Sequence, residues 1–118
     1  MIENKREIGT KHERIAGVFL EKQGYQILSY NYNTRVGEID IIARQEGYLV
    51  FIEVKYRKNA SSGHPLEAVS IQKQKKICKS AMLYMKKYGL EYMPVRFDVV
   101  GILGDKITLI QNAFEFIM

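Results

Sequence analysis

"GEIDIIARQEGYLVFIEVKYR", residues 37–57, predicts two strands joined by a tight turn. Isoleucine, valine, leucine and phenylalanine dominate both strands, yet Asp40, Glu53 and Lys55 interrupt them. A charge in a buried strand is costly unless another group compensates it. These three residues therefore need partners, which are either one another in structural ion pairs or a metal ion and a substrate.

The charged residues of each strand are predicted to share one face. Side chains alternate along a strand, so Glu53 and Lys55 lie on the same face. In the preceding strand Glu38 and Asp40 share a face. The apolar residues behind the two charged faces are Val50, Ile52, Val54, Ile39 and Ile41. Each strand is thus expected to have one apolar face and one face that carries charge.

The turn fixes which charges meet. With Glu-Gly (46–47) as the centre of a two-residue hairpin turn, Asp40 lies opposite Glu53, and Glu38 lies opposite Lys55. Two facing carboxylates would have Cβ atoms about 5 Å apart and would repel each other. A divalent cation resolves this repulsion, because Mg²⁺ binds hard oxygen ligands. The alternative is a Glu38–Lys55 ion pair across the strands, with Asp40 and Glu53 solvated at a sheet edge.

The composition predicts a soluble protein of one domain, residues 1–118, with 47% hydrophobic and 26% charged residues. A single cysteine, Cys78, excludes an intrachain disulfide and a cysteine-rich zinc site, and we expect it to be a small buried apolar residue. No apolar run has signal-peptide or membrane-spanning length, so we expect a cytoplasmic location and no membrane partner. A net charge of +5 favours a polyanionic partner.

The order of predicted elements is helix, three strands, helix and two strands. The first helix, over 11–23, has an apolar face of Ile15, Ala16, Phe19 and Leu20. The strands are expected at 25–32, 37–43, 48–56, 95–103 and 106–110, and the second helix at 66–88. A loop over 57–65 and a short C-terminal tail complete the chain. This order predicts an α/β sandwich with a mixed sheet flanked by helices.

The charged hairpin also resembles a known signature. Asp40, twelve intervening residues and Glu53-x-Lys55 resemble the Asp…Glu-x-Lys pattern of restriction-endonuclease-like nucleases. "GEIDIIA", "VFIEVKYR", "RFDVV" and "NAF", in this order, resemble the YraN family of small bacterial proteins within that superfamily. The likeness extends from Gly9 to Phe114. It implies the restriction-endonuclease-like αβββαβ core.

The resemblance also implies roles for particular residues. The family positions of Asp40 and Glu53 hold a metal ion, here Mg²⁺ or Mn²⁺, and the position of Lys55 serves catalysis. In related junction resolvases a glutamate of the first helix joins the metal site, and Glu13 in "HERIA" matches it. His12 stands where family members usually have glycine. Salt pairing along the helix is the alternative role of Glu13.

Other polar residues have less specific roles. Glu38 is expected beside Lys55 or as a minor metal ligand, and Asp98 is expected to pair with Arg96, two positions away on the same face. His64 precedes a proline in the loop and is expected at the surface. The residues expected to contact phosphates around the acidic centre are Arg35, Arg57, Lys58, Lys73, Lys75 and Lys76.

The sequence therefore predicts a metal-dependent nuclease that hydrolyses phosphodiester bonds, similar to Holliday-junction-resolvase-type enzymes. Its expected partner is nucleic acid, with DNA as the first expectation, and a homodimer stays open. Two alternatives belong to other classes: a non-catalytic nucleic-acid-binding domain that kept the fold, and a protein-interaction domain. Intact Asp40, Glu53 and Lys55 favour the enzyme, because a binding domain has no need for two repelling carboxylates.

Overall fold

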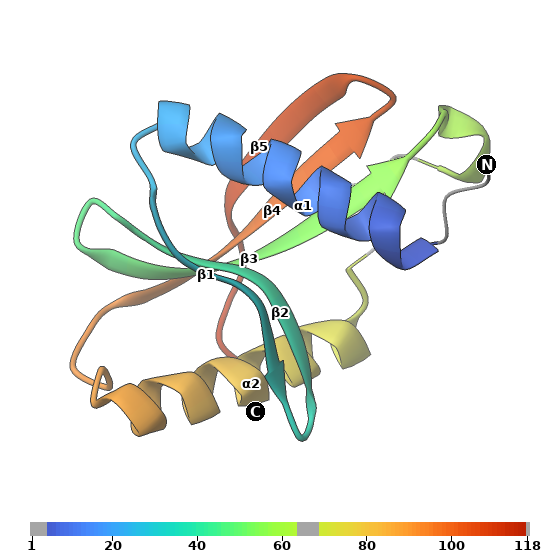
Figure 1. The fold of residues 1–118 in the computed structure, drawn as a ribbon. Coiled ribbons are helices and arrows are strands. Elements are labelled where there is room, and N and C mark those ends of the chain that lie inside the picture. The colour runs from blue at the N-terminus through green and yellow to red at the C-terminus, as the bar shows by residue number, and fades with distance from the viewer. Residues whose placement is uncertain (1–4, 64–68, 118) are drawn as a thin grey trace.

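The computed structural model describes residues 5–63 and 69–117, in which one sheet lies between two helices (Figure 1). The elements are α1 (Lys5–Lys22), β1 (Gln26–Thr34), β2 (Gly37–Gln45), β3 (Tyr48–Arg57), a 3₁₀ helix η1 (Ala60–Ser62), α2 (Ile71–Tyr88), β4 (Val95–Leu103) and β5 (Lys106–Phe114). Their order confirms the predicted α/β class and fits the core of restriction-endonuclease-like proteins.

The sheet is mixed, as predicted. The described strands follow the order β1-β2-β3-β4-β5, and β3 and β4 are parallel while the other neighbours are antiparallel. Parallel neighbours need a crossover connection, which α2 provides. Figure 1 shows α1 above the sheet and α2 below it. Both faces of the sheet are therefore covered.

Each face of the sheet has its own apolar core. The core beneath α2 includes Ile39, Ile42, Leu49, Phe51, Ile77, Cys78, Ala81 and Phe97. The core beneath α1 includes Ala16, Leu20, Ile41, Ala43, Val50, Ile52, Val100 and Ile102. Complete burial of Cys78 confirms its predicted role as a small apolar residue. The charged residues of the predicted site, Asp40, Glu53 and Lys55, are therefore expected at the borders of these two cores.

Strand β3 is buried on both faces, whereas the sequence predicts one apolar face. Leu49 and Phe51 belong to the core beneath α2, and Val50 and Ile52 belong to the core beneath α1. The prediction was wrong because a central strand covered by helices on both sides has no solvent-facing side. Glu53 follows this fully buried run, and its own side chain is 5% exposed.

Helix α1 packs against the sheet through a narrower face than predicted. Ala16 and Leu20 are fully buried, and Phe19 packs against the same core. Ile15, predicted on this face, is 37% exposed, and Val18 is 53% exposed. Ile15 lies at the border of the buried stripe, whereas Val18, two residues from both Ala16 and Leu20, lies on the opposite side of the helix.

The β2–β3 turn has the predicted register. Both central residues, Glu46 (φ 51°) and Gly47 (φ 84°), have positive φ, as a type I′ hairpin turn requires. Ile41 pairs with Ile52, which is the alignment that the turn predicts. Regular pairing of β2 with β3 ends at Ile41 and Ile52, so Asp40, the next residue away from the turn, is not part of it. The alignment of the hairpin is therefore as expected, but the two strands separate at the predicted site.

Strand β2 bends at Asp40. Ile39 lies in the core beneath α2 and Ile41 in the core beneath α1, although strand alternation predicts that they share a face. The adjoining strand is irregular at the same level, where Asn31 has a φ of 53°. Figure 1 shows the β1–β2 hairpin curving away from β3 toward α2. The bend opens a gap between β2 and β3.

Some element boundaries differ from the prediction. Helix α1 already begins at Lys5, and α2 begins at Ile71, after Ser70 caps its first turn. Residues 66–68 of the predicted second helix, like His64, lie outside the described residues. Strand β5 runs to Phe114 and includes part of the predicted tail. Neither α1 nor α2, the α-helices of the described ranges, is long and apolar enough to cross a membrane.

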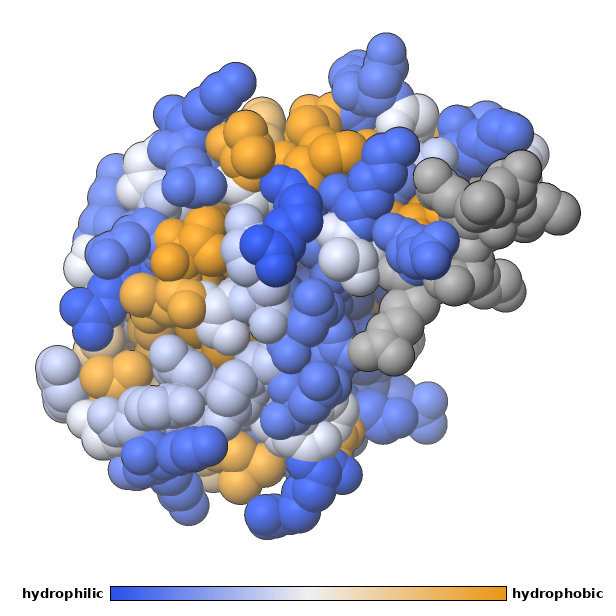
Figure 2. All heavy atoms as spheres, in the orientation of Figure 1, coloured by the Kyte–Doolittle hydropathy of each residue, from blue (hydrophilic) through white to orange (hydrophobic). Residues whose placement is uncertain are grey.

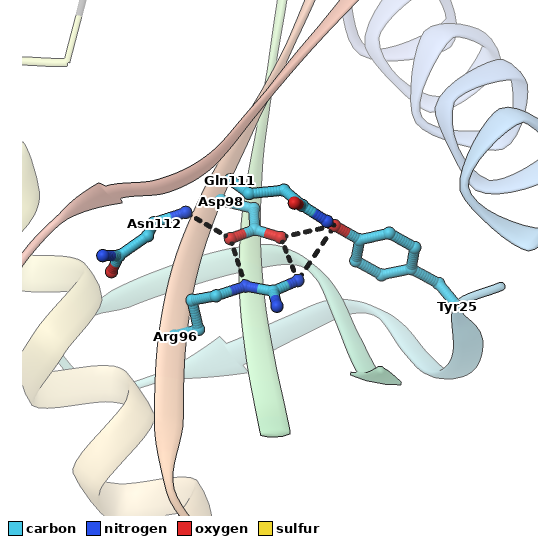
Figure 3. A network of polar contacts seen from close by, with 5 residues as sticks. All are labelled: Tyr25, Arg96, Asp98, Gln111 and Asn112. Atoms are coloured by element: carbon cyan, nitrogen blue, oxygen red, sulfur yellow. Dashed lines mark hydrogen bonds and ion pairs between the residues drawn. The ribbon is translucent and has the colours of Figure 1, made fainter. Parts of the chain in front are cut away.

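Asp98 is fully buried in a network that joins three parts of the chain (Figure 3). Arg96 donates from Nε to Asp98 Oδ1 (2.9 Å) and from Nη2 to Oδ2 (2.8 Å). Tyr25 Oη donates to Asp98 Oδ2 (2.6 Å), and the Asn112 N–H donates to Oδ1 (2.9 Å). Gln111 donates to Tyr25 Oη (2.9 Å). These contacts confirm the predicted Arg96–Asp98 pairing and give Asp98 a structural role.

Asp98→Asn should lower the free energy of unfolding by about 3–5 kcal/mol, because it leaves the Arg96 guanidinium in a buried site without its counter-charge. Urea denaturation measures the loss. Asp105→Asn, in the exposed β4–β5 turn, is the matched control and should change stability by less than about 0.5 kcal/mol. Equal, small effects of both substitutions would show that the network contributes little.

Candidate metal centre

The candidate centre lies in the gap between β2 and β3, at the bend of β2. Asp40 Oδ2 accepts a hydrogen bond from the Val54 N–H of β3 (2.8 Å). A carboxylate thus takes a backbone donor of the neighbouring strand at the point where regular pairing has stopped. This bond fixes the position of Asp40 and leaves its other oxygen available to neighbours.

Three carboxylates from two elements meet at this point. Glu13 of α1 and Glu38 and Asp40 of β2 each place an oxygen within 4.8 Å of the other two. All three donors are hard oxygens, the ligand type that Mg²⁺ and Mn²⁺ prefer. Glu38, expected as a minor or supporting residue, is therefore among the closest group. The described residues that cluster here offer neither sulfur nor imidazole ligands.

Glu53 lies beside this group and is held by two lysines. Its side chain is 5% exposed, and its Oε1 is 3.3 Å from Lys73 Nζ of α2 and 3.7 Å from Lys55 Nζ. Lys55 thus lies next to the acidic residues, as predicted, but its ion pair is with Glu53. The alternative Glu38–Lys55 pair is not formed in the structure. The positive charges of Lys55 and Lys73 therefore compensate the negative charge of the Glu53 carboxylate.

Burial dominates the electrostatics of the centre. It raises the pKa of Asp40 to about 7, and the charge of Glu13 adds to this effect while the Val54 N–H opposes it. Burial likewise raises the pKa of Glu53 to about 7, reinforced by Asp40 and opposed by Lys73 and Lys55. At neutral pH the metal-free centre therefore retains protons that a cation would displace.

Glu13 of α1 lies beside Asp40 of β2, with a carboxylate oxygen of each within 4.8 Å of the other. Burial raises the pKa of Glu13 above its usual range, and the charges of Glu38 and Glu53 add to this effect. The Glu13 side chain therefore joins the acidic residues of β2, which favours the predicted metal-site role over salt pairing along the helix.

The six predicted phosphate contacts divide into groups. Lys73 and Lys76 line a cavity of about 280 Å³ together with Asp40 and Glu38. Arg35 lines a neighbouring hollow near the β1–β2 turn, with Lys79 and Lys86 of α2 among the other residues. The remaining three are not among the residues that line either cavity: Arg57, Lys58 and Lys75. Only part of the predicted basic rim therefore adjoins the acidic centre.

Sequence reasoning missed Asn31, which donates a side-chain hydrogen bond to Glu13. Asn31 also lines a second hollow beside the centre, together with Glu13 and Glu38. Its positive φ is the detectable signal, because asparagine adopts this conformation more readily than most other residues. An asparagine inside the predicted strand 25–32 could therefore have indicated an irregular backbone conformation beside the site.

Without metal, Asp40→Asn should be more stable than the native chain at pH 8, by about 1–3 kcal/mol. A raised carboxyl pKa means that the folded state binds more protons than the unfolded state between about pH 4 and 7, so native stability falls as pH rises through that range. The asparagine cannot ionise, yet its carbonyl oxygen still accepts from Val54. Urea denaturation in a chelator between pH 4 and 8 measures the difference.

Glu91→Gln, at an exposed position, is the control and should follow the native pH profile. If Asp40→Asn were less stable than the native chain at pH 8, the carboxylate would be a structural ion-pair partner, and the account of an uncompensated centre would be wrong.

Comparison with known proteins identifies the family of the chain. The profile of "Uncharacterised protein family UPF0102" matches residues 12–102. A UPF0102 protein of Lachnoclostridium phytofermentans is 52% identical over 113 residues, covering 95% of this chain and 96% of the relative. The UPF0102 proteins of Desulforapulum autotrophicum (45% identical, covering 98% of both chains) and Clostridioides difficile (43%, covering 94% and 99%) are also similar. The chain therefore belongs to the uncharacterised protein family UPF0102, which is the YraN family that its motifs resemble.

Proposed function

We propose that this chain is a metal-dependent nuclease that hydrolyses phosphodiester bonds in nucleic acid. The observation that supports it best is the group formed by Glu13, Glu38 and Asp40, whose oxygens lie within 4.8 Å of one another. Neighbouring carboxylates repel one another, and a cation that joins them relieves this repulsion, most of all at the buried Glu13 and half-buried Asp40. Lys55 and Lys73 beside the group add positive charge where a phosphate would enter.

The residues present fit a hard divalent cation. Asp40, Glu13 and Glu38 would hold Mg²⁺ or Mn²⁺, with Glu53 alongside. When bound, such an ion supplies Lewis-acid chemistry, which polarises a phosphoryl oxygen and makes water a better nucleophile at neutral pH. Burial has already raised the pKa of the carboxyl groups of Asp40 and Glu53, so ion binding would be accompanied by proton release.

The chain itself provides the positive charge that phosphodiester hydrolysis needs. Lys55 Nζ is 3.7 Å from Glu53, and the side chain is 21% exposed, so it is anchored yet accessible. A lysine in this position would stabilise negative charge that develops on the phosphate in the transition state. Glu53 would act as a positioning residue for Lys55, because its Oε1 forms an ion pair with the amine.

The substrate proposed is nucleic acid, with DNA as the first candidate. Lys73 and Lys76 lie at the cavity that holds Asp40, and Arg35, Lys79 and Lys86 continue positive charge into the neighbouring hollow. Phosphate contacts of this kind position a nucleic acid without reading its sequence. The chain's net charge of +5 supports the same partner.

The test is a cleavage assay with linear, flapped and four-way-junction DNA and with RNA, in Mg²⁺ or Mn²⁺. Lys55→Ala should reduce cleavage by at least about 100-fold because it removes transition-state charge stabilisation. Its Mn²⁺ affinity, measured by calorimetry, should stay close to that of the native chain, because Lys55 is not a ligand. Asp40→Asn should lose both cleavage and Mn²⁺ affinity. Lys106→Ala, at an exposed position of β5, is the control and should cleave normally.

The alternatives give different outcomes in the same assay. Salt-sensitive binding of nucleic acid without cleavage of any substrate would identify a non-catalytic binding domain. Absence of binding even at low salt would favour a protein-interaction domain. Either result would overturn the proposed nuclease activity.

A further inference from the structure

Helix α1 carries a second apolar stripe that the sheet does not cover. Its buried stripe, which includes Ala16 and Leu20, packs on the core. Ile15 and Val18 lie outside this stripe, with Val18 on the opposite side of the helix, and they are 37% and 53% exposed. A helix that packs on one sheet needs only one apolar stripe. The second stripe is therefore available for another contact.

This stripe forms one wall of a groove between α1 and β5. Ile15, Val18 and Phe19 line it from α1, and Ile107 lines it from β5, around a hollow of about 550 Å³. Figure 2 shows orange, apolar surface at the upper edge of the molecule, where α1 lies, bordered by blue side chains. An exposed apolar surface of this kind, set in a shallow hollow, is typical of an interaction site.

The groove also carries positive charge along α1. Lys11, Arg14 and Lys22 line it, and none of the described residues lining it is acidic. The Arg14 guanidinium lies 3.9 Å from the centre of the Tyr30 ring, which holds this charge in place. Lys11 and Lys22 are eleven residues apart, which is about 16 Å along a helix, or three turns. The cations thus border the apolar surface over the length of a short helix.

We propose that the α1–β5 groove binds an amphipathic helix of a partner protein, with acidic residues beside its apolar face. The apolar face would pack on Ile15, Val18 and Ile107, and the acidic residues would pair with Lys11 and Lys22. This surface lies on the side of α1 that does not carry the buried Glu13. The proposal therefore does not depend on nuclease activity.

Two other occupants fit the groove less well. In a symmetric contact between two copies, the same surface meets itself, so Lys11, Arg14 and Lys22 would face their own positive charges. An anionic membrane attracts cations, but membrane-binding helices insert a broad apolar face, whereas the described part of α1 exposes two large apolar residues, Ile15 and Val18. An acidic helix satisfies both the charge and the shape.

Two fluorescent synthetic peptides of about 18 residues, long enough to form helix, test the proposal by anisotropy titration. Both carry leucines at i, i+3, i+4 and i+7, but one is flanked by glutamates and the other by lysines. The full chain should bind the glutamate peptide at least about tenfold more tightly than the lysine peptide, and added salt should weaken that binding. Equal affinity for both peptides, or no binding of the glutamate peptide below about 1 mM, would overturn the proposal.

Matched variants locate the binding surface. Val18→Ser and Lys22→Glu should each weaken binding of the glutamate peptide by at least about fivefold. Ile71→Ser, at a residue of α2 that is 60% exposed, and Lys87→Glu, at an exposed position of α2, are the apolar and charge controls and should leave it unchanged. Thermal melts verify that all four variants fold. Equal weakening by the controls would overturn the proposal.

The same variants test the other occupants. Dimerisation of the native chain in sedimentation, abolished by Val18→Ser, would assign the groove to a second copy. Binding to phosphatidylserine vesicles that Val18→Ser abolishes would assign it to a membrane surface. Each of these outcomes would contradict the helix proposal.

Discussion

The hydrogen bond from the Val54 N–H to Asp40 holds the place where β2 separates from β3, and the candidate centre depends on it. Regular pairing of the two strands ends at Ile41 and Ile52. At the next position a side-chain carboxylate, 2.8 Å from the Val54 nitrogen, accepts the neighbouring strand's donor. The gap is therefore fixed in shape, and Glu13 can reach it from α1 while Lys73 reaches its edge from α2.

Two sets of buried acidic residues in this fold contrast with each other. Asp98 is completely buried, but Arg96, Tyr25 and the Asn112 N–H all donate to it, so its charge is compensated within the chain. Asp40 receives one backbone hydrogen bond and lies next to another carboxyl group, and burial raises its pKa to about 7. The first arrangement stabilises the fold. The second is costly to the fold, which is the physical reason to expect an external cation there.

The sequence allowed the element order and the hairpin register to be predicted, because a Glu-Gly turn and strong apolar runs are local signals. It also placed Asp40, Glu13 and Lys55 among the candidates for one site. The bend of β2 was not predictable from the apolar pattern, which places Ile39 and Ile41 on one face, and Glu38 lies in the closest carboxylate group. The Lys73–Glu53 ion pair and the exposure of Ile15 depend on how distant segments of the chain pack together. The apolar periodicity of the sequence does not reveal such packing.

The most direct test of the account is the anomalous scattering of Mn²⁺ in a crystal of the native chain grown with this ion. We expect one peak in the gap between β2 and β3, with oxygens of Asp40 and of Glu13 or Glu38 at about 2.1–2.2 Å. Asp40→Asn crystals should lack this peak. A native crystal at saturating Mn²⁺ with no density in the gap, or with the ion bound elsewhere, would contradict the claim that these carboxylates form a metal centre.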